Sequence, residues 1–113
     1  MATVQSVVSD MLLTVKTREV QRGILAEAAR DRDGAARHFL AAAHLELVLA
    51  NDFAQAGHDV MAFRSQVSAA SCLWRAGQIE KARTIFSDLA QNHPEHAQLI
   101  QDVTADLELS VES

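Results

Sequence analysis

Glycine, proline and tyrosine are scarce in this sequence, and their scarcity argues against a fold built from strands. The 113 residues include four glycines, one proline and no tyrosine, whereas all-β folds depend on glycine and proline at many tight turns. Alanine, the strongest helix former, occurs twenty times. Because a chain of this length fits one domain, we expect a single all-α domain over residues 1–113.

Disulfides and long apolar runs are also missing. Cys72 is the one cysteine, so no disulfide forms within the chain, and no basic, apolar leader precedes Val4. Both features favour a cytoplasmic protein. The most apolar run, residues 39–50, contains His44 and Glu46 and is shorter than the roughly 20 residues that cross a bilayer. We therefore expect no membrane partner.

An excess of positive charge is absent as well. The formal net charge is −5, whereas proteins that bind phosphate backbones usually carry surplus lysine and arginine on one face. Residues 1–92 balance ten acidic side chains against ten basic ones. The surplus acids all follow residue 92: Glu95, Asp102, Asp106, Glu108 and Glu112. A neutral body with an acidic end predicts no nucleic-acid partner.

Motifs for catalysis, for a cofactor and for a metal ion are not found in the sequence. It has no glycine-rich phosphate loop, no Gly-x-Ser-x-Gly elbow, no paired cysteines and no Glu-x-x-His pair. Of the five histidines, only His93 and His96 have a spacing that places both on one helical face. We expect no enzymatic activity, no cofactor and no metal site.

Apolar residues recur at intervals of three and four, which predicts helices. Five such segments lie near residues 3–29, 34–56, 59–76, 79–92 and 95–110. Thr3, Asp33 and Asp59 are suited to cap the first three helices. Gly77 can end the third helix in a left-handed conformation, and Pro94 suits the first turn of the fifth.

The second half of the chain carries an ordered set of small, large and turn-forming residues. They are Ala70, Leu73, Gly77, Ala82, Phe86, Leu89 and Pro94. This set resembles the second half of a tetratricopeptide repeat (TPR) at all of its offsets. A weaker copy precedes it, with Gly23, Ala35, Phe39 and Ala42 at the same spacings. The copies are 47 residues apart (Ala35 to Ala82) rather than the family's typical length of about 34, which we attribute to longer second and third helices.

The resemblance covers roughly residues 16–94 and implies an architecture. It implies two TPR-like antiparallel helical hairpins, at residues 16–50 and 63–94, followed by a covering helix at 95–110. Ala70 and Ala82 would then lie where two helices cross closely. A generic helical-hairpin bundle shares the same alanine and phenylalanine spacing and is the alternative fold.

The third predicted helix carries the candidate binding surface. Arg64, Ser71 and Arg75 are seven and four residues apart and therefore lie on one helical face, with Val67 and Trp74 beside them. In tetratricopeptide proteins the first helix of each repeat lines a groove, so the resemblance makes these five residues the candidate partner-binding site. From the first repeat it adds Thr17, Val20, Ile24, Glu27 and Ala28. Arginine and tryptophan are common at binding hot spots.

These features lead to two hypotheses about function. In the first, the chain is a non-catalytic protein–protein interaction module, or scaffold, whose groove binds a peptide or partner protein. Because guanidinium groups pair with carboxylates, the expected guest is an acidic or C-terminal peptide. The acidic fifth helix would compete with this peptide for the groove, unless that helix completes the core. In the second, apolar stripes form a structural or regulatory homodimer, since two repeats are fewer than the three usually needed for a stable solenoid.

Overall fold

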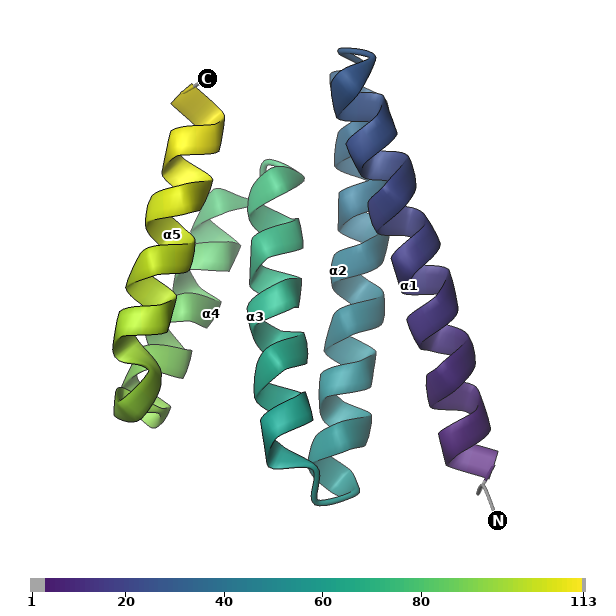
Figure 1. Cartoon of the computed structure of the whole chain (residues 1–113), viewed down its shortest axis with the longest axis vertical. Coiled ribbons are helices and arrows are strands. Elements are labelled where there is room, and N and C mark those ends of the chain that lie inside the picture. Colours follow the sequence, from purple (N-terminus) through teal and green to yellow (C-terminus); the bar gives the residue numbers. More distant parts are fainter. Residues whose placement is uncertain (1–3, 113) are drawn as a thin grey trace.

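Helices account for nearly all of the chain that the computed structural model describes, which is residues 4–112, with side chains over 7–110. The elements in order are α1 (Val4–Ala28), α2 (Arg32–Gln55), α3 (Asp59–Arg75), α4 (Ile79–Asn92), the short 3₁₀-helix η1 (Pro94–His96) and α5 (Ala97–Glu112). Residues 4–112 contain no strand (Figure 1). The predicted all-α fold of about five helices is confirmed.

The helices end where local sequence predicts. Gly57 and Gly77 both have a left-handed backbone, with φ of 80° and 87°. After α3, the Gly77 amide donates to the Trp74 carbonyl at 2.9 Å and the Gln78 amide donates to the Leu73 carbonyl at 2.8 Å. This pair of bonds is a Schellman motif, which satisfies the last carbonyls of a helix. Pro94, predicted for the first turn of the fifth helix, is instead the first residue of the separate 3₁₀-helix η1, and α5 begins three residues later at Ala97.

The predicted N-caps are wrong at two helices. The cap of α2 is Asp31, whose Oδ1 accepts a hydrogen bond from the Gly34 amide at 2.9 Å, and Asp33 lies in the first turn. Gly34 has no side chain, so the Asp31 carboxylate can approach its amide closely. Asp59 is likewise the first residue of α3, where its charge favours the helix dipole. The third predicted cap, Thr3, lies outside the described residues.

The five α-helices form two layers. α1, α3 and α5 lie in a front layer, and α2 and α4 lie behind them, with successive helices antiparallel (Figure 1). The structure measures 45 × 31 × 17 Å, and its shortest dimension corresponds to two packed helices. α3 packs against both α2 and α4, so it is the central helix of the fold.

α1 and α2 approach each other closely at Gly23 and Phe39. A Cβ added at Gly23 of α1 would lie 2.9 Å from ring atoms of Phe39 of α2. The residues 47 positions later, Ala70 and Phe86, are also buried. Buried residues therefore occupy the corresponding small and aromatic positions of both predicted copies.

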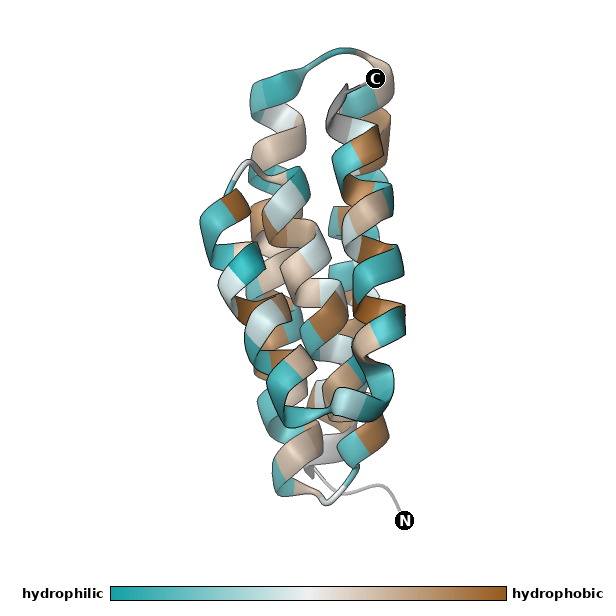
Figure 2. Ribbon diagram, turned by 90° about the vertical axis from the view of Figure 1, so that its left-hand side faces the viewer, coloured by the Kyte–Doolittle hydropathy of each residue, from teal (hydrophilic) through white to brown (hydrophobic). Residues whose placement is uncertain are grey.

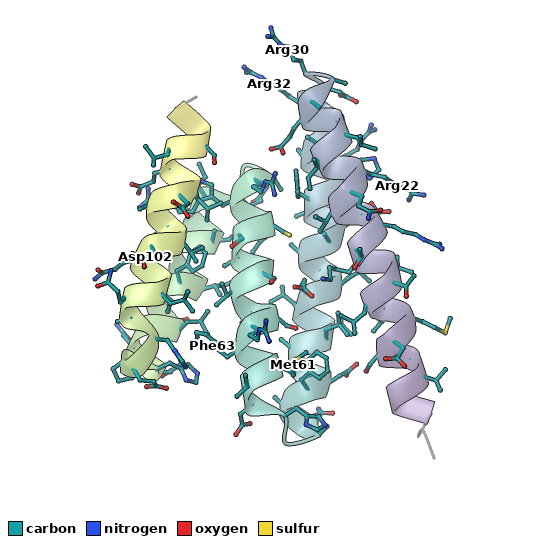
Figure 3. All side chains as sticks on the ribbon, in the orientation of Figure 1. Arg22, Arg30, Arg32, Met61, Phe63 and Asp102 are labelled. Carbon is teal, nitrogen blue, oxygen red and sulfur yellow. The ribbon has the colours of Figure 1, made fainter. Side chains whose placement is uncertain are left out.

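α5 packs onto the core through one side only. Ile100 and Leu107 are buried in the main apolar cluster, and Val103 packs against it. Leu99, which belongs to the predicted apolar stripe, is instead 47% exposed, because it lies 100° around the helix from Ile100. Asp102 points away from α3 and α4 (Figure 3). The side chain of Val111, the last member of that stripe, lies outside the described residues.

Apolar residues are interspersed with polar ones along the helices, as the view from the α5 side shows (Figure 2). None of the helices in the described part of the chain is both long enough and apolar enough to cross a membrane.

Candidate functional site

The exposed side of α3 lies in the front layer, between α1 and α5 (Figure 1). We define the α3 front face as Arg64, Ser68, Ser71 and Arg75, which recur at intervals of three and four residues. Ser71 is partly buried and the other three are exposed. Arg64, Ser71 and Arg75 were expected to share one face, and α3 places them on one face.

Arg75 is held in place by the two helices on its α1 side. Its Nη2 lies 2.6 Å from Oε1 of Glu27 in α1, and its guanidinium carbon lies 4.2 Å from the ring centre of Phe39 in α2. Glu27 was predicted to line the same groove from the first repeat. The ion pair fixes the Arg75 side chain and neutralises part of its charge.

Arg64 differs from Arg75 because its charge is unpaired. It is exposed and makes no ion pair or hydrogen bond with another residue in the part of the chain that the structure describes. Ser71, between the two arginines, donates its hydroxyl hydrogen to the Val67 carbonyl at 2.9 Å. The front face therefore presents one free guanidinium and one that is fixed.

Trp74 does not border this face, contrary to the sequence analysis. It is only 3% exposed, because its position on α3 points toward α4, where the Arg83 guanidinium lies 4.9 Å from its ring centre. Its indole Nε1 is buried without a hydrogen-bond partner among the described residues. Val67 is partly buried and packs against the core. Both apolar side chains were expected to be open to a ligand, but Trp74 is buried and Val67 packs against the core.

A buried carboxylate, not expected from the sequence to have a role, lies in α2 and faces α1 and α3. Glu46 is 2% exposed, and its Oε1 lies 3.8 Å from Nζ of Lys16 in α1. Burial raises the pKa of Glu46, while the Lys16 charge and the Ser68 hydroxyl act in the opposite direction. The signal in the sequence was a lone acid in the apolar run 39–50.

Cys72 lies near Glu46 and is also buried. Burial, reinforced by the Glu46 charge, raises the pKa of its thiol to about 11. At neutral pH this side chain is therefore a protonated thiol, which is a poor nucleophile. Its position agrees with a structural role in the core.

His93 and His96 pack against an aromatic ring. The ring centres of His93 and His96 lie 5.0 and 4.6 Å from that of Phe63, which points from α3 toward the turn between α4 and α5 (Figure 3). Glu95 Oε1 lies 3.5 Å from His93 Nδ1. No group of three or more potential metal ligands occurs in the described residues.

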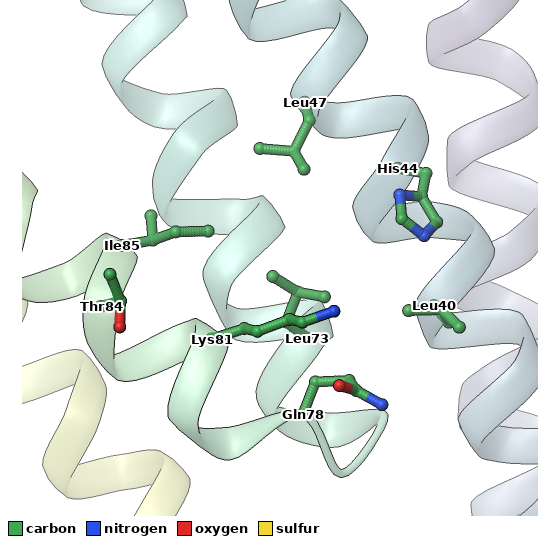
Figure 4. Close-up of a pocket in the computed structure, with 8 residues that line it drawn as sticks. All are labelled: Leu40, His44, Leu47, Leu73, Gln78, Lys81, Thr84 and Ile85. Carbon is green, nitrogen blue, oxygen red and sulfur yellow. The ribbon is translucent and has the colours of Figure 1, made fainter.

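A cleft that was not expected from the sequence opens on the back layer. We call it the α2/α4 cleft; its volume is about 480 Å³. Its floor is Leu73 of α3, which faces backward between the two helices (Figure 4). The other lining residues come from α2 and from α4 with its N-cap: Leu40, His44, Leu47, Gln78, Lys81, Thr84 and Ile85.

No protein-family profile, curated protein or solved structure matches this chain.

Proposed function

We propose that this protein is a non-catalytic interaction module with a TPR-like architecture, which binds an acidic segment of a partner protein across the α3 front face. The observation that carries this proposal is the unpaired Arg64 on the same exposed helical face as the fixed Arg75. A carboxylate at Arg64 completes a charge-assisted pair that the chain itself does not supply.

The spacing of the two arginines sets the length of the guest. Arg64 and Arg75 are eleven positions apart on α3, which corresponds to about 16 Å along the helix axis. About five residues of an extended peptide span that distance. Ser68 and Ser71 lie between the arginines and are small, so a peptide backbone can approach α3 there. A guest with two acidic groups about five residues apart fits this face.

The arrangement of layers also supports this assignment. In the TPR-like interpretation, α1 and α3 are the first helices of the two repeats, and both lie in the front layer (Figure 1). Their side chains meet at the Arg75–Glu27 ion pair. Interaction modules of this kind need an exposed face with fixed donors and no reactive group, and the buried Cys72 thiol and Glu46 carboxylate agree with such a role.

The test is a comparison of two charge reversals. The full chain, its Arg64→Glu variant and its Arg32→Glu variant are immobilised and used to capture proteins from the source cell. Arg32 is also exposed but lies at the start of α2 (Figure 3), so it matches the change in net charge. A partner retained by Arg32→Glu and lost by Arg64→Glu supports the proposal. If Arg64→Glu retains every partner of the parent, the front face is not the binding surface.

Self-association is the second candidate function, and exposed apolar residues on α1 favour it. Val8, Met11 and Val15 lie on one side of α1 and are 44%, 64% and 44% exposed. A second copy of α1 is the partner that a homodimer would place against them. Sedimentation of the parent and of Met11→Lys tests this: a dimer that becomes monomeric in the variant supports it, and a parent that is monomeric at all concentrations contradicts it.

A further inference from the structure

The α2/α4 cleft has a polar end and an apolar end. Lys81 extends from α4 toward Leu40 and His44 of α2, while Leu47 and Ile85 lie at the opposite end (Figure 4). Among its eight lining residues there is one lysine, one histidine and no acid. Lys81 makes no ion pair or hydrogen bond with another residue that the structure describes. The cleft therefore has an apolar floor and an unneutralised cation at one end.

We propose that this cleft binds an amphipathic helix of a partner protein, which inserts two apolar side chains one turn apart over Leu73 and places a carboxylate beside Lys81. The site is separate from the α3 front face, which lies on the opposite layer of the molecule (Figure 1). It adds a second docking surface to the proposed interaction module.

The walls of the cleft match a helical guest. On α2 the lining residues are Leu40, His44 and Leu47, which recur at intervals of four and three, so they form a straight row about 10 Å long. Amphipathic helices dock into such grooves through anchors at i, i+3 or i+4 and i+7. A helix placed here packs on α2 and α4 from behind, as α3 already does from the front.

The exposure of the walls argues for a helix rather than for a small apolar molecule. Small-molecule pockets usually bury about 70–90% of their ligand. Here most of the side chains on the two walls, including His44, Leu47 and Lys81, are exposed to solvent. A long guest that covers both walls buries more of this surface than a compact ligand does, and the lysine selects an acidic guest over a basic one.

Designed peptides test the proposal directly. The probes are two fluorescein-labelled peptides of about 16 residues, a length that supports helix formation. One carries leucine at i and i+4 and glutamate at i+7, and the other carries the reverse order, so that both directions are covered. Fluorescence anisotropy with the full chain is expected to show saturable binding of one of the two.

Adjacent residues provide a matched pair of variants. Leu47 and Val48 are neighbours on α2, are 37% and 48% exposed, and differ in that only Leu47 lines the cleft. Leu47→Asp is expected to weaken peptide binding by at least about tenfold, because it places a charge at the apolar end. Val48→Asp, with the same change in charge, is expected to leave binding unchanged, and equal melting temperatures show that both variants fold.

The charge preference is tested by a swap. Lys81→Glu is expected to weaken the glutamate peptide about fivefold or more and to improve binding of the same peptide with lysine in place of glutamate. Arg32→Glu, which reverses an exposed charge that does not line the cleft, is expected to change neither affinity. The front-face proposal is tested by Arg64→Glu and this one by Leu47→Asp and Lys81→Glu, so each can fail separately.

Any one of four outcomes would overturn the proposal. The first three are that neither peptide binds the parent at concentrations up to about 1 mM, where the affinity would be negligible, that Leu47→Asp binds the peptide as tightly as the parent does, and that Lys81→Glu does not change the charge preference. The fourth is that decanoate binds with the same dependence on Leu47 while no peptide binds, in which case the cleft is a site for a small apolar acid.

Discussion

Replacement of Gly23 by alanine tests the close contact between α1 and Phe39 of α2. In an isolated helix this change stabilises by about 1 kcal/mol, because alanine is the better helix former. In this fold the new Cβ would lie 2.9 Å from Cε2 and Cζ of Phe39 and 3.0 Å from Cδ2, whereas carbon atoms prefer about 3.5–4.0 Å. The two helices must therefore separate by roughly 0.6–1 Å at this point.

The phenylalanine ring cannot relieve the contact by moving away. Phe39 has no exposed surface, and the Arg75 guanidinium lies 4.2 Å from its ring centre. Overpacking of a tight core costs about 1–3 kcal/mol, and three close contacts with an immobile ring favour the upper part of that range. After subtraction of the helix-propensity gain, Gly23→Ala is expected to destabilise by about 1–2 kcal/mol.

Urea unfolding and thermal unfolding, both followed by circular dichroism, measure the effect. The expected loss corresponds to a fall in melting temperature of roughly 4–8 °C for a chain of this size. Phe39→Leu removes the ring, so Gly23→Ala in that background is expected to be neutral or stabilising, and the double-mutant cycle isolates the contact. A Gly23→Ala variant more stable than the parent would refute the crossing geometry.

Four further predictions follow from the same structure. Ala70→Leu and Ala82→Leu are each expected to destabilise by about 1–3 kcal/mol in urea unfolding, because both alanines are fully buried and extra side-chain atoms overpack a core. Ala105→Leu, on the exposed side of α5, is expected to be near neutral. Arg30 has a left-handed backbone (φ 61°) at the end of α1, so Arg30→Gly is expected to raise the free energy of unfolding by roughly 0.5–1 kcal/mol; no gain would show that the strain is absent. Burial raises the pKa of Glu46 above its ordinary value of 4.5, so the contribution of this side chain to the free energy of unfolding is most favourable at low pH and is lost as the pH rises through the raised pKa. Glu46→Gln is therefore expected to be more stable than the parent at pH 7, and the difference in stability is expected to disappear below about pH 4.5. A difference that does not depend on pH would contradict this. Removal of residues 95–113 is expected to unfold or strongly destabilise the chain in thermal melts, because Ile100 and Leu107 belong to the core; an unchanged melting temperature would show that α5 is dispensable.

Features of the fold that depend on local sequence were predictable. Gly57 and Gly77 follow the ends of helices because glycine readily adopts the left-handed backbone found there. Pro94 begins a helix because its ring fixes φ at a helical value. The N-cap of α2 was assigned two residues late. Asp31 and Asp33 have equal cap propensity, and Gly34, which allows the close approach of Asp31, decides between them.

Features that depend on how helices pack were harder to predict. Helical spacing placed Arg64, Ser71 and Arg75 on one face, but it could not show that Trp74 points into the core beside Arg83. The α2/α4 cleft arises because α3 separates two helices that are not neighbours in sequence, leaving Leu73 as its floor. No spacing within a single helix contains that information.

Trp74 provides an intrinsic fluorescence probe of whether the protein unfolds cooperatively. With one tryptophan and no tyrosine, its intrinsic fluorescence comes almost entirely from an indole buried near Arg83 of α4. Circular dichroism reports on all five helices, whereas this emission reports on the surroundings of Trp74, where α3 packs against α4. Coincident transitions would mean that the layers melt as one unit. An earlier change in fluorescence would mean that α4 and α5 separate first, as a part of a fold with lower local stability does.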